Sequence, residues 1–222
     1  MNKKGLCMLL VAALVFAAAL PLMPQTAAAS GDVEIGGATV SWDELCTAGS
    51  AAYDAYLKDE TSVDITLLGN VIGSLTVPDT VTTLTISGNG TITGDGTAPG
   101  AIFMEGASTL ILNGKIKIEG EGFEVALAYF ASGTLQLADG ADVTLLGGTN
   151  ADACPASAIG SQGDLTIHFG QGSKLVATNG EMKCAFEKYA NGDLNIIGTE
   201  YSTAIIVGGN LTFTGTDRKS VV

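Results

Sequence analysis

Short apolar strands that recur in a fixed order are the feature that most limits the fold of this chain. Beyond residue 60, runs of Thr, Val, Ile and Leu alternate with period two and end at Gly, Asn or Asp. The first of these runs are residues 63–67, 75–77, 84–86, 91–93, 110–112 and 116–118. Such alternation, bounded by turn residues, is typical of half-buried strands. The sequence therefore predicts an all-β fold class.

The later runs repeat as a unit. Leu135, Leu165 and Leu194 each follow a glycine by two residues and are 30 and 29 residues apart. Small residues that precede them are expected to stack in one inward column: Ala126, Ala158 and Ala185. A fixed order of unlike strands is typical of a solenoid in which each coil stacks on the last, here a parallel β-helix. The alternative is a β-sandwich, which also has many short strands but no fixed order of unlike ones.

One stretch near the N-terminus has a helical pattern. Ser41 and Glu44 have the spacing of a capping box, and apolar residues from Trp42 to Leu57 recur at helical spacing. The pattern predicts a single helix over about 42–57. Because an exposed strand edge invites aggregation, we expect this helix to cap the first coil.

The N-terminus has the order of a secretory signal peptide. Two lysines precede an apolar run over 6–22, and small residues follow up to Ala29. This order predicts cleavage after Ala29, so that residues 1–29 are a signal peptide and the protein is secreted or displayed at the cell surface. The alternative, an uncleaved anchor, is weakened by two prolines that interrupt a run already short for a membrane span.

The C-terminus has a different composition from the rest of the chain. Residues 217–222 resemble the translation of a common sequencing adapter, and they contain Arg218, the only arginine. We therefore expect the β-helix domain to span 30–216 and to be truncated. The alternative is a short basic tail.

Charge excludes one class of ligand. The chain has 10 basic and 23 acidic residues, which gives a net charge of −13. Nucleic-acid binding depends on clustered Lys and Arg that neutralise phosphates. We therefore expect no nucleic-acid partner, no anionic membrane surface as a partner and no membrane span in the mature chain.

Several segments resemble known families. Residues 41–45, 64–72 and 84–94 resemble the opening coils of bacterial pectate-lyase-like surface proteins, and 163–167 with 172–178 are similar to carbohydrate-binding β-helix domains. The resemblance implies a right-handed parallel β-helix, compatible with calcium, that acts on polysaccharide at the cell surface. It does not by itself imply catalysis, because one scaffold carries many functions.

Catalytic residues are not apparent. A lyase of the pectate type requires an arginine base, and residues 30–216 contain no arginine. A polygalacturonase-like hydrolase requires paired aspartates and a Gly-His-Gly motif, neither of which occurs. The one histidine, His168, is expected on the outer face of a strand, without partners for a nucleophilic triad. We therefore predict no enzymatic activity and no cofactor except calcium.

Oxygen ligands for calcium occur at two predicted corners. They are Asp139 with Asp142, and Asn150 with Asp152. The alternative is that these residues only form tight turns, since no calcium-binding repeat is present.

Aromatic residues follow the small-residue column and are candidates for sugar binding. These candidates are Tyr129, Phe186, Tyr189 and Tyr201. Aromatic rings pack on apolar ligand faces while a tyrosine hydroxyl can hydrogen-bond. In a strand, however, Tyr129 and Phe130 point to opposite faces, so that one of them is core. The alternative is that these rings fill the core.

Two cysteines have matching positions in the repeat. Cys154 precedes Leu165 by 11 residues and Cys184 precedes Leu194 by 10, which predicts a disulfide between neighbouring coils. Cys46 is expected to be a small buried hydrophobe.

Together these observations predict a secreted β-helix protein that is an adhesin-like or polysaccharide-binding module without catalytic activity. Its partner would be an extracellular polysaccharide or a host or cell-wall glycan, bound by a monomer or by part of a longer chain. The alternatives are the N-terminal coils of a larger polysaccharide lyase or glycoside hydrolase, or a structural stalk.

Overall fold

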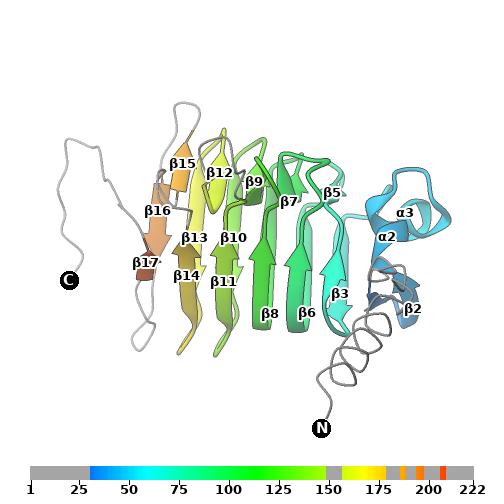
Figure 1. Cartoon of the computed structure of the whole chain (residues 1–222), viewed down its shortest axis with the longest axis horizontal. Helices are drawn as coiled ribbons and strands as arrows, with labels where there is room; N and C mark the ends of the chain where they lie inside the picture. Colours follow the sequence, from blue (N-terminus) through cyan, green and yellow to red (C-terminus); the bar gives the residue numbers. More distant parts are fainter. Residues whose placement is uncertain (1–30, 149–156, 179–185, 189–193, 198–205, 209–222) are drawn as a thin grey trace, which may run out of the picture.

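The structure is a computed structural model of the 222-residue chain. It describes residues 31–148 and 157–178, together with three further strands at 186–188, 194–197 and 206–208. This part of the chain is mostly β, with parallel sheets, as the sequence predicts. Its strands lie side by side along the long axis of the molecule (Figure 1).

The larger sheet has twelve strands within the described residues. They are β1 (Asp32–Ile35), β2 (Ala38–Ser41), β3 (Ser62–Leu67), β4 (Val71–Ile72), β6 (Thr83–Thr93), β8 (Ser108–Glu119), β10 (Gly133–Leu137), β11 (Asp142–Leu146), β13 (Leu165–Phe169), β14 (Lys174–Thr178), β16 (Leu194–Ile197) and β17 (Ile206–Gly208). Strand β8 pairs with both β10 and β11, because β10 pairs with the first half of β8 and β11 pairs with its second half.

The smaller sheet has five strands within the described residues. They are β5 (Leu75–Val77), β7 (Gly100–Met104), β9 (Val125–Tyr129), β12 (Ile159–Ser161) and β15 (Phe186–Lys188). All pair in parallel, in the order in which they occur along the chain. From β3 onward, therefore, a strand pairs with a strand that the chain reaches only after passing through the other sheet.

The core lies between the two sheets and follows the alternation of the strands. Leu84 and Leu110 pair across β6 and β8, and Ile86 pairs with Leu112 two residues further on. All four side chains are fully buried, while the residues between them are partly exposed. Alternation with period two thus places one face of each strand in the core.

The repeat unit has a longer period at one point than the sequence motifs indicate. Leu165 pairs with Leu194, as expected, but Leu135 pairs with Ile167 rather than with Leu165. The predicted alignment of Leu135 with Leu165 is therefore wrong by two residues. A shift of two keeps every side chain on its own face, so the apolar pattern of the sequence fits both registers.

Small residues are buried where the repeat predicted them. Leu127 pairs with Ile159, which aligns the preceding Ala126 and Ala158, and both alanines are 0% exposed. Ala185, the third residue of this column, lies outside the described residues.

The predicted helix over 42–57 is wrong in one respect, because two short helices take its place. They are α2 (Trp42–Cys46) and α3 (Ala51–Tyr56). Between them Thr47 is extended and Gly49 has φ +81°, a conformation that ends a helix. The side chain of Ser50, and not that of Ser41, caps a helix: its hydroxyl oxygen accepts a hydrogen bond from the Tyr53 backbone N–H at 3.0 Å.

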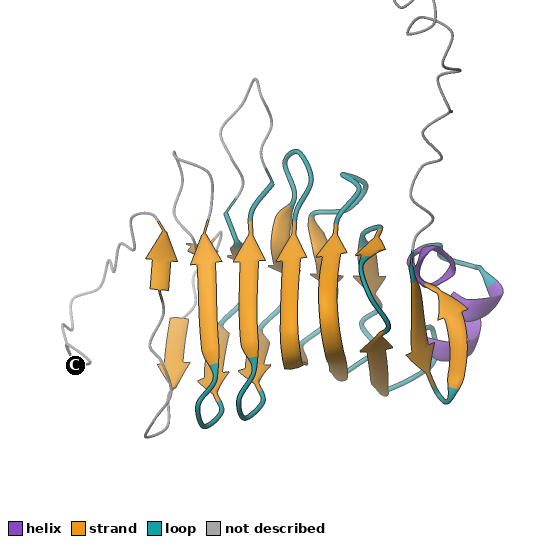
Figure 2. Cartoon of the chain, turned by 60° about the horizontal axis from the view of Figure 1, so that its bottom comes forward, coloured by secondary structure: helices purple, strands orange, loops and turns teal. Residues whose placement is uncertain are grey.

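The first strand edge is covered mainly by a hairpin. β1 and β2 form an antiparallel pair, and β1 pairs antiparallel with β3. Figure 2 shows this hairpin and both helices at the same end of the molecule. Helix α2 packs against β4 and β5, where the fully buried Trp42 donates its indole N–H to the Gly73 carbonyl at 3.0 Å.

Two glycines mark a change of direction in the longest strands. Gly88 and Gly114 face each other in β6 and β8, with φ of +96° and +130°. A Cβ on Gly114 would lie 2.0 Å from the Gly88 carbonyl oxygen, so no other residue fits without a shift of the backbone.

Neither α2 nor α3 has the length and apolar character needed to cross a bilayer, and the described residues contain no other helix.

Candidate functional site

The outer face of the five-stranded sheet carries a small apolar cluster. On this face Thr76, Phe103, Ala128 and Gly160 are neighbours in register on β5, β7, β9 and β12. Phe103 packs on Val125 and Ala128, which are 5% and 7% exposed and form a hydrophobic cluster outside the main core. A sheet face that only contacted water would carry polar residues at these positions.

Three phenylalanines lie in β7 or next to the ends of β9, and we call Phe103, Phe123 and Phe130 the aromatic strip. The Phe123 and Phe130 side chains are 68% and 57% exposed, and Phe103 is partly buried. Exposed aromatic side chains that adjoin a buried apolar cluster are typical of interaction sites. The sequence indicated Phe130 only as the opposite of Tyr129, and it did not single out Phe103 or Phe123.

The ends of β9 position the two most exposed rings. Phe130 directly follows β9, and its backbone N–H donates to the Met104 carbonyl at 3.0 Å. Phe123 lies before β9, in a turn closed by a hydrogen bond from the Glu124 N–H to the Glu121 carbonyl at 3.0 Å. At about 3.3 Å per strand residue, the backbone from Val125 to Phe130 extends about 17 Å. Phe123 and Phe130 are therefore attached at opposite ends of β9.

Tyr129, a sugar-binding candidate from the sequence, lies in the core. It is 2% exposed, its hydroxyl donates to the Thr134 carbonyl at 3.0 Å, and burial raises the pKa of the phenol. A Cβ on Gly133 would lie 2.2 Å from its ring, so this glycine makes room for it. The buried ring has no face to offer a sugar, which corrects the choice of Tyr129. The expected opposition of Tyr129 and Phe130 is confirmed, with Phe130 outside.

The side chains of the other sugar-binding candidates lie outside the described part of the structure. Phe186 belongs to β15 and pairs with Ile159, but its side chain is not described. Tyr189 and Tyr201 lie outside the described residues.

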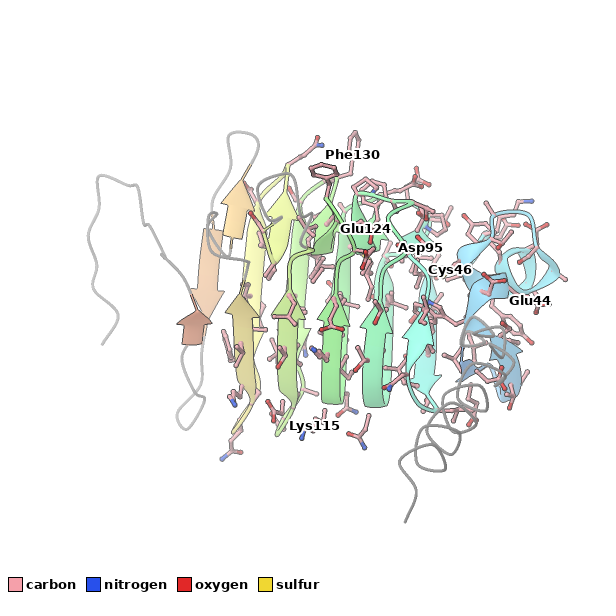
Figure 3. All side chains as sticks on the ribbon, in the orientation of Figure 1. Glu44, Cys46, Asp95, Lys115, Glu124 and Phe130 are labelled. Atoms are coloured by element: carbon pink, nitrogen blue, oxygen red, sulfur yellow. The ribbon has the colours of Figure 1, made fainter. Side chains whose placement is uncertain are left out.

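A buried carboxylate holds the turn that carries Phe123. The Glu124 side chain is 2% exposed, and its two oxygens accept hydrogen bonds from the backbone N–H groups of Ala98 and Glu121, at 3.2 and 3.1 Å. The Ser74 hydroxyl lies 2.6 Å from Glu124 Oε1. Glu124 thus joins three separate segments beneath one end of the strip (Figure 3).

Asp95 extends this network towards solvent. Its Oδ1 lies 2.8 Å from the Ser74 hydroxyl and accepts the Thr97 N–H at 3.0 Å. Burial by itself raises the pKa of the Asp95 carboxyl, but the hydrogen bonds from Thr97 and Ser74 outweigh it and lower the pKa. The network therefore favours an ionised Asp95.

The two calcium candidates within the described residues, Asp139 and Asp142, contact protein groups. Asp139 Oδ1 accepts the Gln171 N–H at 2.7 Å, and Asp142 lies 3.9 Å from the Lys174 ammonium group. Across the described ranges no three His, Cys, Asp or Glu side chains gather as metal ligands. Asn150 and Asp152 lie outside the described residues, so calcium binding there stays a prediction.

Of the cysteines and the histidine, the structure describes Cys46 and His168. Cys46 packs against the core, and burial, followed by the charges of Asp95 and Asp43, raises the pKa of its thiol. Cys46 is thus partly buried rather than fully buried, and it contacts the core as the sequence predicts. The predicted disulfide partners Cys154 and Cys184 lie outside the described residues. His168 lies on the outer face of β13, opposite Gln136 of β10, as expected.

No family model, curated protein or solved structure matches this chain. The resemblance to pectate-lyase-like proteins therefore stays a prediction, and the case for a site rests on geometry.

Proposed function

We propose that this chain is a secreted polysaccharide-binding module of the cell surface, without catalytic activity, built as a right-handed parallel β-helix. The aromatic strip carries the proposal for binding. The β-helix and its hand are supported by the strand order, in which parallel neighbours are separated by a passage through the other sheet. Connections between parallel strands are right-handed in about 98% of cases.

Aromatic rings of this kind suit sugars. The C–H faces of a pyranose are apolar and stack on an aromatic ring, and polar side chains at the edges take the hydroxyls. Thr76 lies beside Phe103 in register, and the exposed Glu105 follows Met104, which is hydrogen-bonded to Phe130. The strip thus combines ring faces with polar edges.

The shape of the strip favours a polymer over a single sugar. Its exposed rings flank β9 at both ends, so a ligand that contacts Phe123 and Phe130 together must be extended. An elongated chain of sugars meets this requirement.

Binding of the purified protein to a panel of insoluble and soluble polysaccharides tests this proposal, with Phe123→Ala and Phe130→Ala as variants. The matched control is Leu68→Ala, since Leu68 is 55% exposed and lies after β3, away from the strip. Loss of one stacking ring is worth about 1 kcal/mol, so each Phe variant should bind about fivefold more weakly. Equal effects of all three variants, or no binding to any polysaccharide, would overturn the proposal.

A further inference from the structure

A second surface of the molecule has the features of a ligand site. Strands β6, β8 and β11 lie side by side in the larger sheet, and their outer face forms an open groove of about 410 Å³. The side chains that line it are Asn89, Thr91, Lys115, Lys117, Asp142 and Thr144. In Figure 3, Lys115 and Phe130 lie at opposite edges of the molecule, so this groove is separate from the aromatic strip.

Strand register explains the shape of the groove. Lys115 on β8 lies between Asn89 on β6 and Asp142 on β11, and Lys117 lies in the same way between Thr91 and Thr144. The two long lysine side chains therefore rise from the central strand, with shorter polar side chains on either side. The buried Ile116 between them keeps both lysines on the outer face.

The charges in the groove are not balanced. Lys117 forms an ion pair with Glu119, and Asp142 lies 3.9 Å from Lys174 on the far side of β11. Lys115 is exposed and has no carboxylate within ion-pair distance among the described residues. In a chain with a net charge of −13, its ammonium group is thus an exposed positive charge outside any ion pair, with Asp142 as its neighbour in register.

Hydrogen-bond donors accompany this charge. The Asn89 side-chain oxygen accepts the Lys115 backbone N–H at 2.9 Å, which fixes the orientation of the amide. The amide NH₂ of Asn89 then has no acceptor within the described part of the chain and is available to a ligand. The hydroxyls of Thr91 and Thr144 line the same groove. A cation beside neutral donors is the arrangement that binds an oxyanion.

We propose that this groove binds a carboxylate or sulfate group of a hydroxylated ligand, with the Lys115 ammonium and the Asn89 amide as donors to the anionic oxygens. Lys117 adds positive charge, and the threonine hydroxyls contact the ligand's own hydroxyls. Asp142 opposes binding, because its carboxylate lies beside Lys115 in register. This site does not depend on glycan binding by the aromatic strip.

The test uses three polymers with one backbone: carboxymethyl-dextran, dextran sulfate and unmodified dextran. We expect the purified protein to bind one or both of the anionic polymers and not the neutral one. Binding of one alone identifies the anion that the site takes. Because exposed charges are screened by salt, the affinity should fall between about 20 mM and about 300 mM NaCl.

Variants separate a site from a general effect of charge. Lys115→Gln should weaken binding about fivefold or more, whereas Lys58→Gln, the same change on an exposed lysine after α3, should leave it within about twofold. Asp142→Asn should strengthen binding, a gain that a folding defect cannot produce. The proposal is overturned if neither anionic polymer binds, or if the two lysine variants weaken binding equally.

Discussion

Replacement of Glu124 by glutamine tests how the turn beneath the aromatic strip is held. The side chain keeps its size, but glutamine has one acceptor oxygen where glutamate has two. Both oxygens of Glu124 accept backbone N–H groups, from Ala98 on Oε1 and from Glu121 on Oε2. In either orientation of a glutamine amide, its NH₂ group must therefore face one of these two donors.

The magnitude follows from that conflict. A buried donor without an acceptor costs about 1–3 kcal/mol. For a protein of this size, each kcal/mol lowers the melting temperature by about 2–4 °C. We therefore expect Glu124→Gln to lower the free energy of unfolding by about 2 kcal/mol and the melting temperature by about 4–8 °C.

Urea denaturation followed by tryptophan fluorescence measures this change, because Trp42 is the only tryptophan and is fully buried. Glu121→Gln is the matched control: it makes the same charge change three residues away, on an exposed side chain. The control should stay within about 0.5 kcal/mol of the wild type. If Glu124→Gln is as stable as Glu121→Gln, the buried network does not hold the turn and the reasoning is wrong.

Three further predictions concern single residues. The lowered pKa of Asp95 means that its contribution to stability is present above the unfolded pKa of about 3.9 and is lost as the pH falls through the folded pKa. Asp95→Asn should therefore destabilise the protein at pH 7 but not at pH 2, as measured by urea titration at both pH values. The raised pKa of the Cys46 thiol predicts slow alkylation by iodoacetamide at pH 8 in the native protein and fast alkylation in urea; peptide mass spectrometry showing equal rates would contradict it. Gly114→Ala should cost about 2 kcal/mol or more, because φ is +130° and the Cβ meets backbone, whereas Gly69→Ala, with no atom within 4 Å of its Cβ, should be neutral in thermal denaturation.

Sequence patterns located the strands well because strand formation depends on local features. Alternation of apolar residues identified the buried positions of β6 and β8. The glycines and asparagines expected to end the runs at 84–86 and 110–112 instead lie inside these two continuous strands. The break between α2 and α3 was missed because the apolar spacing continues across it. Gly49 and Ser50 were the local signals that could have revealed it.

Contacts between distant residues decided the candidate site. Alternation predicts that Tyr129 and Phe130 point in opposite directions, but it does not say which one points inward, because the five-stranded sheet is apolar on both faces. That choice depends on Gly133, which makes room for the Tyr129 ring. The groove at Lys115 was equally hidden, because the residues that face each other across its three strands are more than 20 positions apart in the chain.

The sequence by itself therefore determined the mostly β character of the protein, the phase of half-buried strands such as β6 and β8, and the acidic charge, all of which depend on residues close together in the chain or on composition alone. Only the tertiary structure decided the register between Leu135 and Ile167, the burial of Glu124 and the exposure of the phenylalanines. These features depend on which strands become neighbours. A shift of two residues leaves the apolar pattern unchanged, so packing, and not pattern, has to select among the alternatives.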